Sequence, residues 1–176
     1  MVVLDTMAPY AFCDMQMLRG AGNEYVIKEV SVYSSQYDVS RGTVVFQPPY
    51  AENILSAEQR KRNDYVTKRI HGLKWNSGTI PYEEHGAMIR ELLRDYSRVY
   101  VKGLEKLRLL LTYIPAMHIY DLEQYGCPRL ETLPKFFVPF HGSEHSVFPT
   151  HNCAALNAKR IGLWYEYDVI RRVTSS

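Results

Sequence analysis

The stretch YVIKEVSVY (residues 25–33) decides the fold, because it is rich in β-branched and aromatic residues and partly alternates between apolar and polar. This composition predicts a β-strand. Before it, residues 1–7 form a short apolar stretch that contains Asp5, and we expect a buried strand there, followed by a turn at the polar, glycine-containing residues 19–23. After it, GTVVF (residues 42–46) predicts a third strand. Three strands with short connections predict an antiparallel meander.

The remaining sequence alternates between helical and extended patterns. We expect one helix that begins near Ser56 and three more that span 81–95, 104–113 and 152–167. We expect strands at 99–101 and 118–122, and a proline-containing loop with one helical turn at 127–150. Three strands come first along the chain, and helices and strands alternate after them. This order favours an α/β fold with a single mixed sheet of about five strands and helices on both faces. No repeat or linker divides the chain, so residues 1–176 are predicted to form one domain.

Bulk composition favours a globular protein inside the cell. Hydrophobic residues make up 46% of the 176 residues, which is enough for a sizeable core. The formal net charge of +2 demands no polyanionic partner but allows a local basic patch. The three cysteines form no CxxC pair or disulfide framework, and no segment reaches the ~20 apolar residues of a membrane span. We therefore expect a cytoplasmic or nuclear protein that does not bind membranes.

Three short motifs and the order of elements resemble the DEDD exonucleases, which have an RNase H-like fold. The stretch VVLDT (residues 2–6) is similar to the first strand of that family, which ends in a metal-binding Asp, and IKEVSV (residues 27–32) is similar to its second strand. The stretch HNCAALNA (residues 151–158) resembles its last helix, which starts near a general-base His and carries the final Asp. The resemblance implies Asp5 and Glu29 as catalytic candidates.

Several acids that the family's chemistry needs are replaced in this sequence. Cleavage with two metal ions requires several carboxylates that converge on the Mg²⁺ pair. Met7 stands where the second acid is expected, Lys106 lies near the place of the Asp after the fourth strand, and Leu156 or Asn157 replaces the final Asp. This predicts a catalytically degenerate domain. The alternative is an active Mg²⁺-dependent nuclease, in which another acid fills a vacancy; the acids that could do so are Glu105, Asp121 and Asp168.

A branch of this fold, the Maelstrom domain, is the closest resemblance. That branch lacks the DEDD acids and binds zinc through a Glu, His and Cys constellation. The resemblance implies a structural zinc site here, with Glu29 at the position of its Glu and Cys127 as a reserve ligand; the implied metal ligands are His71, His141, His145 and Cys153. A zinc ion would fix a proline-rich loop that has few apolar residues. The alternative is that these histidines are hydrogen-bonded loop residues.

Basic residues gather in two places, with aromatic residues near the first. The candidate nucleic-acid contacts are Arg60, Lys61, Arg62, Lys68 and Arg69 around the middle helix, and Lys102 and Lys106 after the fourth strand. Lys74 belongs to the first group, which also contains Tyr65 and Trp75. Cations neutralise phosphates and aromatic rings stack on unpaired bases, so this pattern indicates nucleic-acid binding. The alternative is a solvated helix face.

These observations together predict a degenerate exonuclease-like domain that acts as a nucleic-acid-binding or interaction module, with RNA or another single-stranded nucleic acid as its partner. The other two hypotheses are the active exonuclease-like enzyme described above and a structural domain that binds a protein partner.

Overall fold

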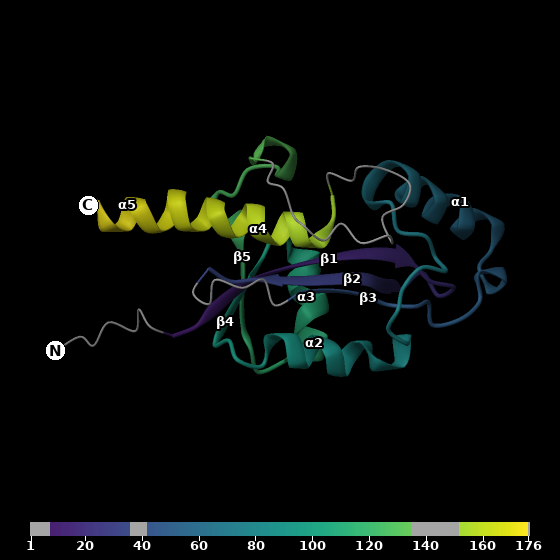
Figure 1. Cartoon of the computed structure of the whole chain (residues 1–176). Helices are drawn as coiled ribbons and strands as arrows, with labels where there is room; N and C mark the ends of the chain where they lie inside the picture. Colours follow the sequence, from purple (N-terminus) through teal and green to yellow (C-terminus); the bar gives the residue numbers. More distant parts are fainter. Residues whose placement is uncertain (1–7, 36–41, 135–151, 176) are drawn as a thin grey trace.

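A computed structural model describes residues 8–35, 42–134 and 152–175 of the chain. The strands are β1 (Tyr10–Arg19), β2 (Tyr25–Tyr33), β3 (Gly42–Val45), β4 (Arg98–Val101) and β5 (His118–Asp121). The α-helices are α1 (Ala57–Val66), α2 (His85–Leu93), α3 (Leu104–Tyr113), α4 (Ala154–Trp164) and α5 (Arg171–Thr174). The π-helical turn η2 (Thr67–His71) extends α1, and η7 (Tyr165–Ile170) joins α4 to α5 in one continuous rod (Figure 1).

The five strands form one mixed sheet in the order β3-β2-β1-β4-β5. The central strand β1 is antiparallel to β2 and parallel to β4, and β4 is parallel to β5. The α/β architecture with a single mixed sheet is therefore confirmed. In the part of the chain that the structure describes, no helix has the length and apolar character needed to cross a bilayer.

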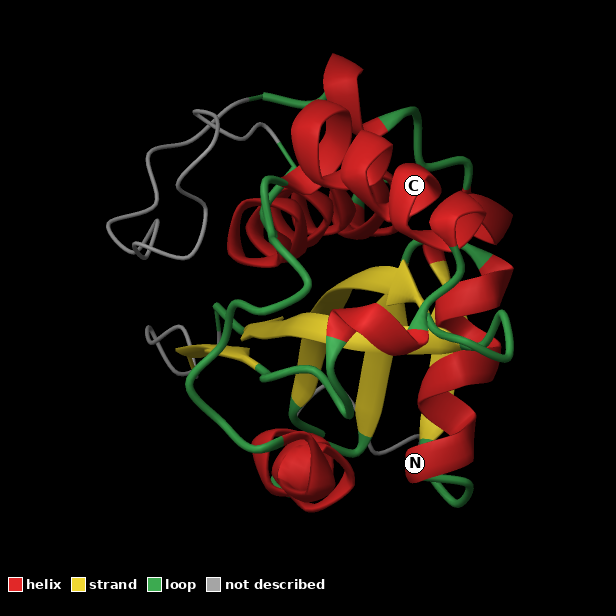
Figure 2. Ribbon diagram, turned by 90° about the vertical axis from the view of Figure 1, so that its right-hand side faces the viewer, coloured by secondary structure: helices red, strands yellow, loops and turns green. Residues whose placement is uncertain are grey.

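Helices cover both faces of the sheet, as the sequence predicts (Figures 1 and 2). Alternate residues of β1 face opposite sides. Ala11, Cys13 and Met15 pack into the main core with residues of α2 and α3. Phe12 packs on the other side with Ile161 of α4. Asp14 and Gln16 follow Phe12 at intervals of two, so they also face α4.

Helix α4 packs against the sheet through a glycine at the contact. A Cβ atom at Gly162 would come within 2.8 Å of the Phe12 ring and 2.7 Å of the Tyr33 ring. Any larger residue there would push the helix away from β1 and β2. The close approach also brings the first turns of α4 onto the middle of β1.

Within the described residues, the expected elements agree with the structure except at the first strand; of the loop expected at 127–150, residues 135–150 lie outside the described residues. The predicted strand at residues 1–7 lies outside the described residues, and the sequence interpretation missed β1, which occupies residues 10–19. The strand at 25–33 and the helix at 104–113 have the predicted bounds. Ser56 caps α1 as expected, and a full capping box with Gln59 fixes the start of that helix.

Candidate functional site

A buried carboxylate on the central strand is the focus of the candidate site. The Asp14 side chain is only 2% exposed and contacts two other elements. Its Oδ1 pairs with the ammonium group of Lys106 on α3, and its Oδ2 accepts a hydrogen bond of 3.0 Å from Nδ2 of Asn157 on α4. We call these three residues the Asp14 centre.

The end of β4 positions Lys106 for this contact. Because β4 is the parallel neighbour of β1, helix α3 begins beside the middle of the sheet. Gly103 makes the turn with φ +108°, a conformation that glycine adopts readily, and its N–H donates to Asp121 Oδ1 at 2.8 Å. Lys106 lies in the first turn of α3 and reaches back to Asp14, with 19% of its side chain exposed.

A second group of contacts holds the start of α4 on the sheet. The Glu29 carboxylate accepts a 2.6 Å hydrogen bond from the N–H of Ala154, the first residue of α4, where the helix dipole favours a negative charge. Gln16 is the β1 neighbour of Glu29 and donates to the carbonyl of Asn152. Both side chains are buried. They fix the backbone from which Asn157 reaches Asp14.

Cys153 caps the N-terminus of α4. Its Sγ accepts a hydrogen bond of 3.3 Å from the N–H of Leu156, and the residue is 1% exposed. Burial raises the pKa of the Cys153 thiol to about 12, and the neighbouring charges of Glu29 and Asp14 act in the same direction. At neutral pH this side chain is therefore a neutral thiol rather than a nucleophilic thiolate.

The donor set of the Asp14 centre does not suit a pair of Mg²⁺ ions. The Asp14 carboxylate is already bonded to an ammonium and an amide group, and Glu29 accepts from a helix N-terminus. The other polar side chains described around Asp14 are the amides of Gln16 and Asn157 and the ammonium group of Lys106. A two-metal site needs several free carboxylates instead. Oδ1 of Asn157 is buried and has no hydrogen-bond partner among the described residues. These side chains therefore do not supply the free carboxylates of a two-metal site.

The predicted zinc ligands fall partly outside the described residues. His141 and His145 lie there, and so does the catalytic candidate Asp5. The buried His71 ring accepts a 3.0 Å hydrogen bond from the Leu73 N–H at Nδ1, so its Nε2 carries the proton and donates to the Met17 carbonyl at 3.1 Å. Zinc binding at His71 would require one of these bonds to break. Within residues 8–35, 42–134 and 152–175, no group of three or more His, Cys, Asp or Glu side chains could hold a metal.

Cys127, the predicted reserve zinc ligand, is packed in an apolar cluster. Its side chain lies in the apolar cluster between the sheet and α4, and burial raises the pKa of its thiol to about 11. A zinc site through His141 and His145 stays a prediction.

The predicted basic residues of the middle helix form an exposed surface on α1, η2 and the loop that follows. Its six cations are all exposed: Arg60, Lys61, Arg62, Lys68, Arg69 and Lys74. Two carboxylates, Glu58 and Asp64, lie in the same segment, so the segment is clearly basic although the whole chain carries only +2. We call this region the α1 basic surface.

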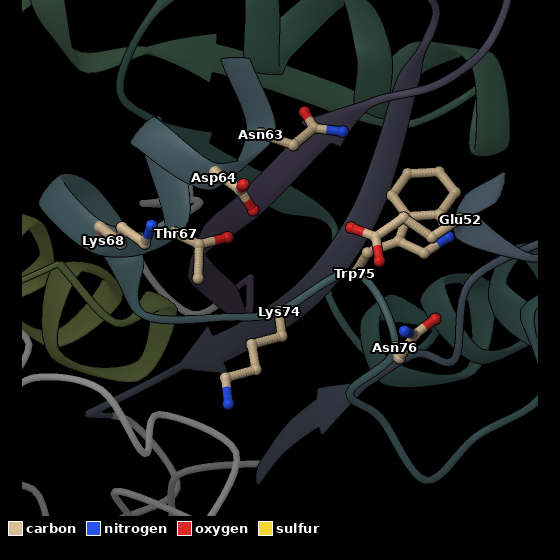
Figure 3. A pocket seen from close by; sticks show the side chains of 8 residues that line it. All are labelled: Glu52, Asn63, Asp64, Thr67, Lys68, Lys74, Trp75 and Asn76. Carbon is tan, nitrogen blue, oxygen red and sulfur yellow. The ribbon is translucent and has the colours of Figure 1, made fainter. Parts of the chain in front are cut away.

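A cavity of about 410 Å³ opens in this surface (Figure 3). The side chains that line it are Glu52, Asn63, Asp64, Thr67, Lys68, Lys74, Trp75 and Asn76. Figure 3 shows Asp64 and Lys68 coming from the helical segment and Lys74 from the loop drawn below it. Two lysines face two carboxylates here, so the cavity itself is electrically mixed, and the basic character belongs to the outer helix surface.

The other two predicted nucleic-acid contacts form ion pairs with carboxylates of the same chain. Lys102 pairs with Glu123 at 3.0 Å with only 12% of its side chain exposed, and Lys106 pairs with Asp14. The sequence interpretation named Lys106, and either Leu156 or Asn157, as replacements for expected acids, but it did not connect them with Asp14. The signal that could have found Asp14 is its place in a stretch of mostly apolar residues, YAFCDMQM (residues 10–17).

No known family model matches the chain, and no curated protein matches it.

Proposed function

We propose that this chain is a catalytically degenerate exonuclease-like domain that binds RNA or another single-stranded nucleic acid without cleaving it. One observation carries the proposal: the ammonium group of Lys106 is bonded to the central carboxylate Asp14, and the amide of Asn157 completes the contact. A cation and an amide thus stand where metal-dependent cleavage would need acids.

The arrangement of elements supports the resemblance to RNase H-like exonucleases. Three strands, a helical segment, and then strand, helix, strand and helix follow one another in the order on which the resemblance rests. In this proposal Asp14 takes the role of the first Asp, which we expected at Asp5. Gln16 then stands two residues later, where the family has its second acid. Lys106 and Asn157 take the other two positions, so only one of the four acids remains.

The α1 basic surface supports nucleic-acid binding. Its cations are exposed, and a polyanion that binds them releases counterions, which makes binding depend on salt. Such binding is largely independent of base sequence, as expected for a module that contacts phosphates.

A combined binding and cleavage assay tests the proposal. A labelled single-stranded RNA of about twelve nucleotides is titrated with the protein while fluorescence anisotropy is recorded at several salt concentrations. Gel analysis of the same mixtures with Mg²⁺ or Mn²⁺ detects cleavage. We expect binding that weakens steadily with salt, and intact RNA.

Two results would contradict the proposal. Cleavage that disappears in Asp14→Asn would establish the active nuclease instead. No binding at low salt would favour the alternative in which the domain contacts a protein partner.

A further inference from the structure

Three aromatic rings form a continuous row across the sheet. Phe12, Tyr100 and Tyr120 are register partners on the neighbouring strands β1, β4 and β5. The Phe12 and Tyr100 ring centroids lie 5.5 Å apart with an interplanar angle of 25°, and those of Tyr100 and Tyr120 lie 5.4 Å apart at 30°. Both pairs are stacked, so the row is one stack that runs from the centre of the sheet to its edge.

The row ends in solvent. Exposure rises from 0% at Phe12 through 3% at Tyr100 to 36% at Tyr120. Because β5 is the edge strand of the sheet formed by residues 8–35, 42–134 and 152–175, no further described strand covers the Tyr120 ring. Tyr125, which is 43% exposed, stands beside the stack at 75° to the Tyr100 ring with a centroid distance of 6.4 Å. The stack therefore has an open outer end and an aromatic side wall.

An arginine side chain lies next to the row on strand β4. Arg98 precedes Tyr100 by two residues on β4 and so lies on the same face of the sheet. Its guanidinium donates to the Tyr100 hydroxyl at 3.4 Å and lies 5.5 Å from the centroid of the Tyr10 ring. Among the described residues the structure gives Arg98 no ion pair, and its buried Nε has no hydrogen-bond partner. The guanidinium therefore contacts tyrosines and not a described carboxylate.

We infer that the open end of this row is a stacking subsite for one unpaired nucleobase, with Arg98 attracting the adjoining phosphate. The inference rests on the proposed function and names where the bound strand places a base. Nucleobases stack on tyrosine faces regardless of sequence, and a fourth flat ring continues the existing stack. The Arg98 guanidinium contacts Tyr100, the neighbour of Tyr120 in the row, and its charge favours a polyanion over a neutral ligand, because arginine recognises phosphate well.

The test removes the ring from the protein and, separately, the bases from the ligand. The two probes are a labelled oligouridine of about twelve nucleotides and an abasic oligomer with the same number of phosphates. We expect Tyr120→Ala to weaken oligouridine binding about tenfold while Tyr120→Phe retains it. Binding of the abasic oligomer should be weaker in the wild type and should not change in Tyr120→Ala.

A matched control is Tyr167→Ala. Tyr167 is 59% exposed, and its ring lies against Arg171 rather than in the row. This variant should bind both oligomers as the wild type does.

The outcomes separate this inference from the proposed function. If the wild type binds oligouridine but Tyr120→Ala binds it equally well, the stacking subsite is wrong and the proposed function stands. If Tyr120→Ala weakens both oligomers to the same extent, the ring does not stack on a base, and the inference is again overturned. If the wild type binds neither oligomer, both proposals fail.

Discussion

The Asp14 centre and the α1 basic surface contain the same kinds of charged group but bond them differently. In the centre, the Lys106 ammonium and the Asp14 carboxylate are bonded to each other, and Asn157 supplies a further donor. On the α1 basic surface, the cations are exposed, and the ion pair of Arg62 with Glu58 is 4.0 Å long between side chains that are 50% and 88% exposed. Such a pair contributes little to stability.

The difference follows from burial. A charge that is removed from water must be paired, so the charged groups of the Asp14 centre are bonded to each other and affect the stability of the fold. Charges that stay in water cost little and remain available for an external polyanion. Substitutions in the first region should therefore change stability, and substitutions in the second should change binding.

The largest effect is expected from Asp14→Ala. The change leaves the Lys106 ammonium and the Asn157 amide donor without their acceptor in a mostly buried place. We expect the free energy of unfolding to fall by about 3 kcal/mol, in the range for a broken buried pair. Urea denaturation followed by circular dichroism measures this.

A double variant serves as its control. Asp14→Leu combined with Lys106→Met removes both charges at once and should recover the part of the loss that comes from the unpaired Lys106 charge, because an apolar pair of similar size often replaces a buried ion pair without loss. The part that comes from the Asn157 amide, which still lacks its acceptor, should remain. A loss below about 0.5 kcal/mol in Asp14→Ala would show that the centre behaves like a surface pair and would remove the contrast between the two regions.

The next effect concerns the α1 basic surface. In the triple variant Arg60→Ala, Lys68→Ala and Arg69→Ala, we expect affinity for single-stranded RNA to fall about tenfold at low salt. The slope of log K against log salt should become shallower by about 0.7 for each phosphate that the variant no longer neutralises. Salt-titrated anisotropy measures both quantities, and the free energy of unfolding should stay within about 0.5 kcal/mol of the wild type.

A second triple variant with the same loss of charge controls for net charge. Arg90, Arg94 and Arg108 are exposed on or next to α2 and α3, away from α1. Their replacement by Ala should leave the salt slope unchanged. Equal weakening in the two triple variants would mean that binding follows net charge and not this surface.

Much of the fold could be predicted because its elements are locally encoded. The alternation in residues 25–33 marks β2, and the leucines of 104–113 mark α3. The central strand was missed because Asp14 and Gln16 interrupt the apolar pattern on its face toward α4, although the stretch as a whole is mostly apolar. Polar residues inside a strand are satisfied by tertiary partners, which the local pattern does not contain.

The candidate site depends on contacts between distant parts of the chain. Lys106 is 92 residues from Asp14, and Asn157 is 143 residues from it. The resemblance to a known family pointed to Lys106, and to Leu156 or Asn157, as replacements, but it placed the first acid at Asp5. Only the register of β1 against β4 and the approach of α4 show which acid they meet.

A smaller effect is expected at the start of α4. Glu29→Gln removes a buried negative charge from the N-terminus of the helix while keeping an oxygen that can accept from the Ala154 N–H. We expect a loss of about 1 kcal/mol in the free energy of unfolding, from the weaker hydrogen bond and the lost interaction with the helix dipole. Urea denaturation at neutral pH measures it.

Glu58→Gln is the matched control, because Glu58 lies in the first turn of α1 with its side chain 88% exposed. Solvent screens that carboxylate, so its loss should cost only a few tenths of a kcal/mol. Equal losses in the two variants would show that a buried carboxylate at the start of α4 contributes no more to stability than an exposed one at the start of α1.

The smallest effect is expected from Cys153→Ser. Cys153 caps α4 through its Sγ, and a serine Oγ can accept the same hydrogen bond from the Leu156 N–H, since serine is a favoured N-cap residue. We therefore expect the free energy of unfolding to change by less than about 1 kcal/mol, measured by urea denaturation with and without a metal chelator.

The comparison with and without the chelator distinguishes a capping role of Cys153 from zinc binding. If Cys153 holds zinc together with His71, His141 and His145, the chelator would lower the stability of the wild type sharply, and Cys153→Ser would reproduce that loss together with the loss of bound zinc in elemental analysis. If the sulfur only caps the helix, both proteins should unfold at the same urea concentration whether or not the chelator is present.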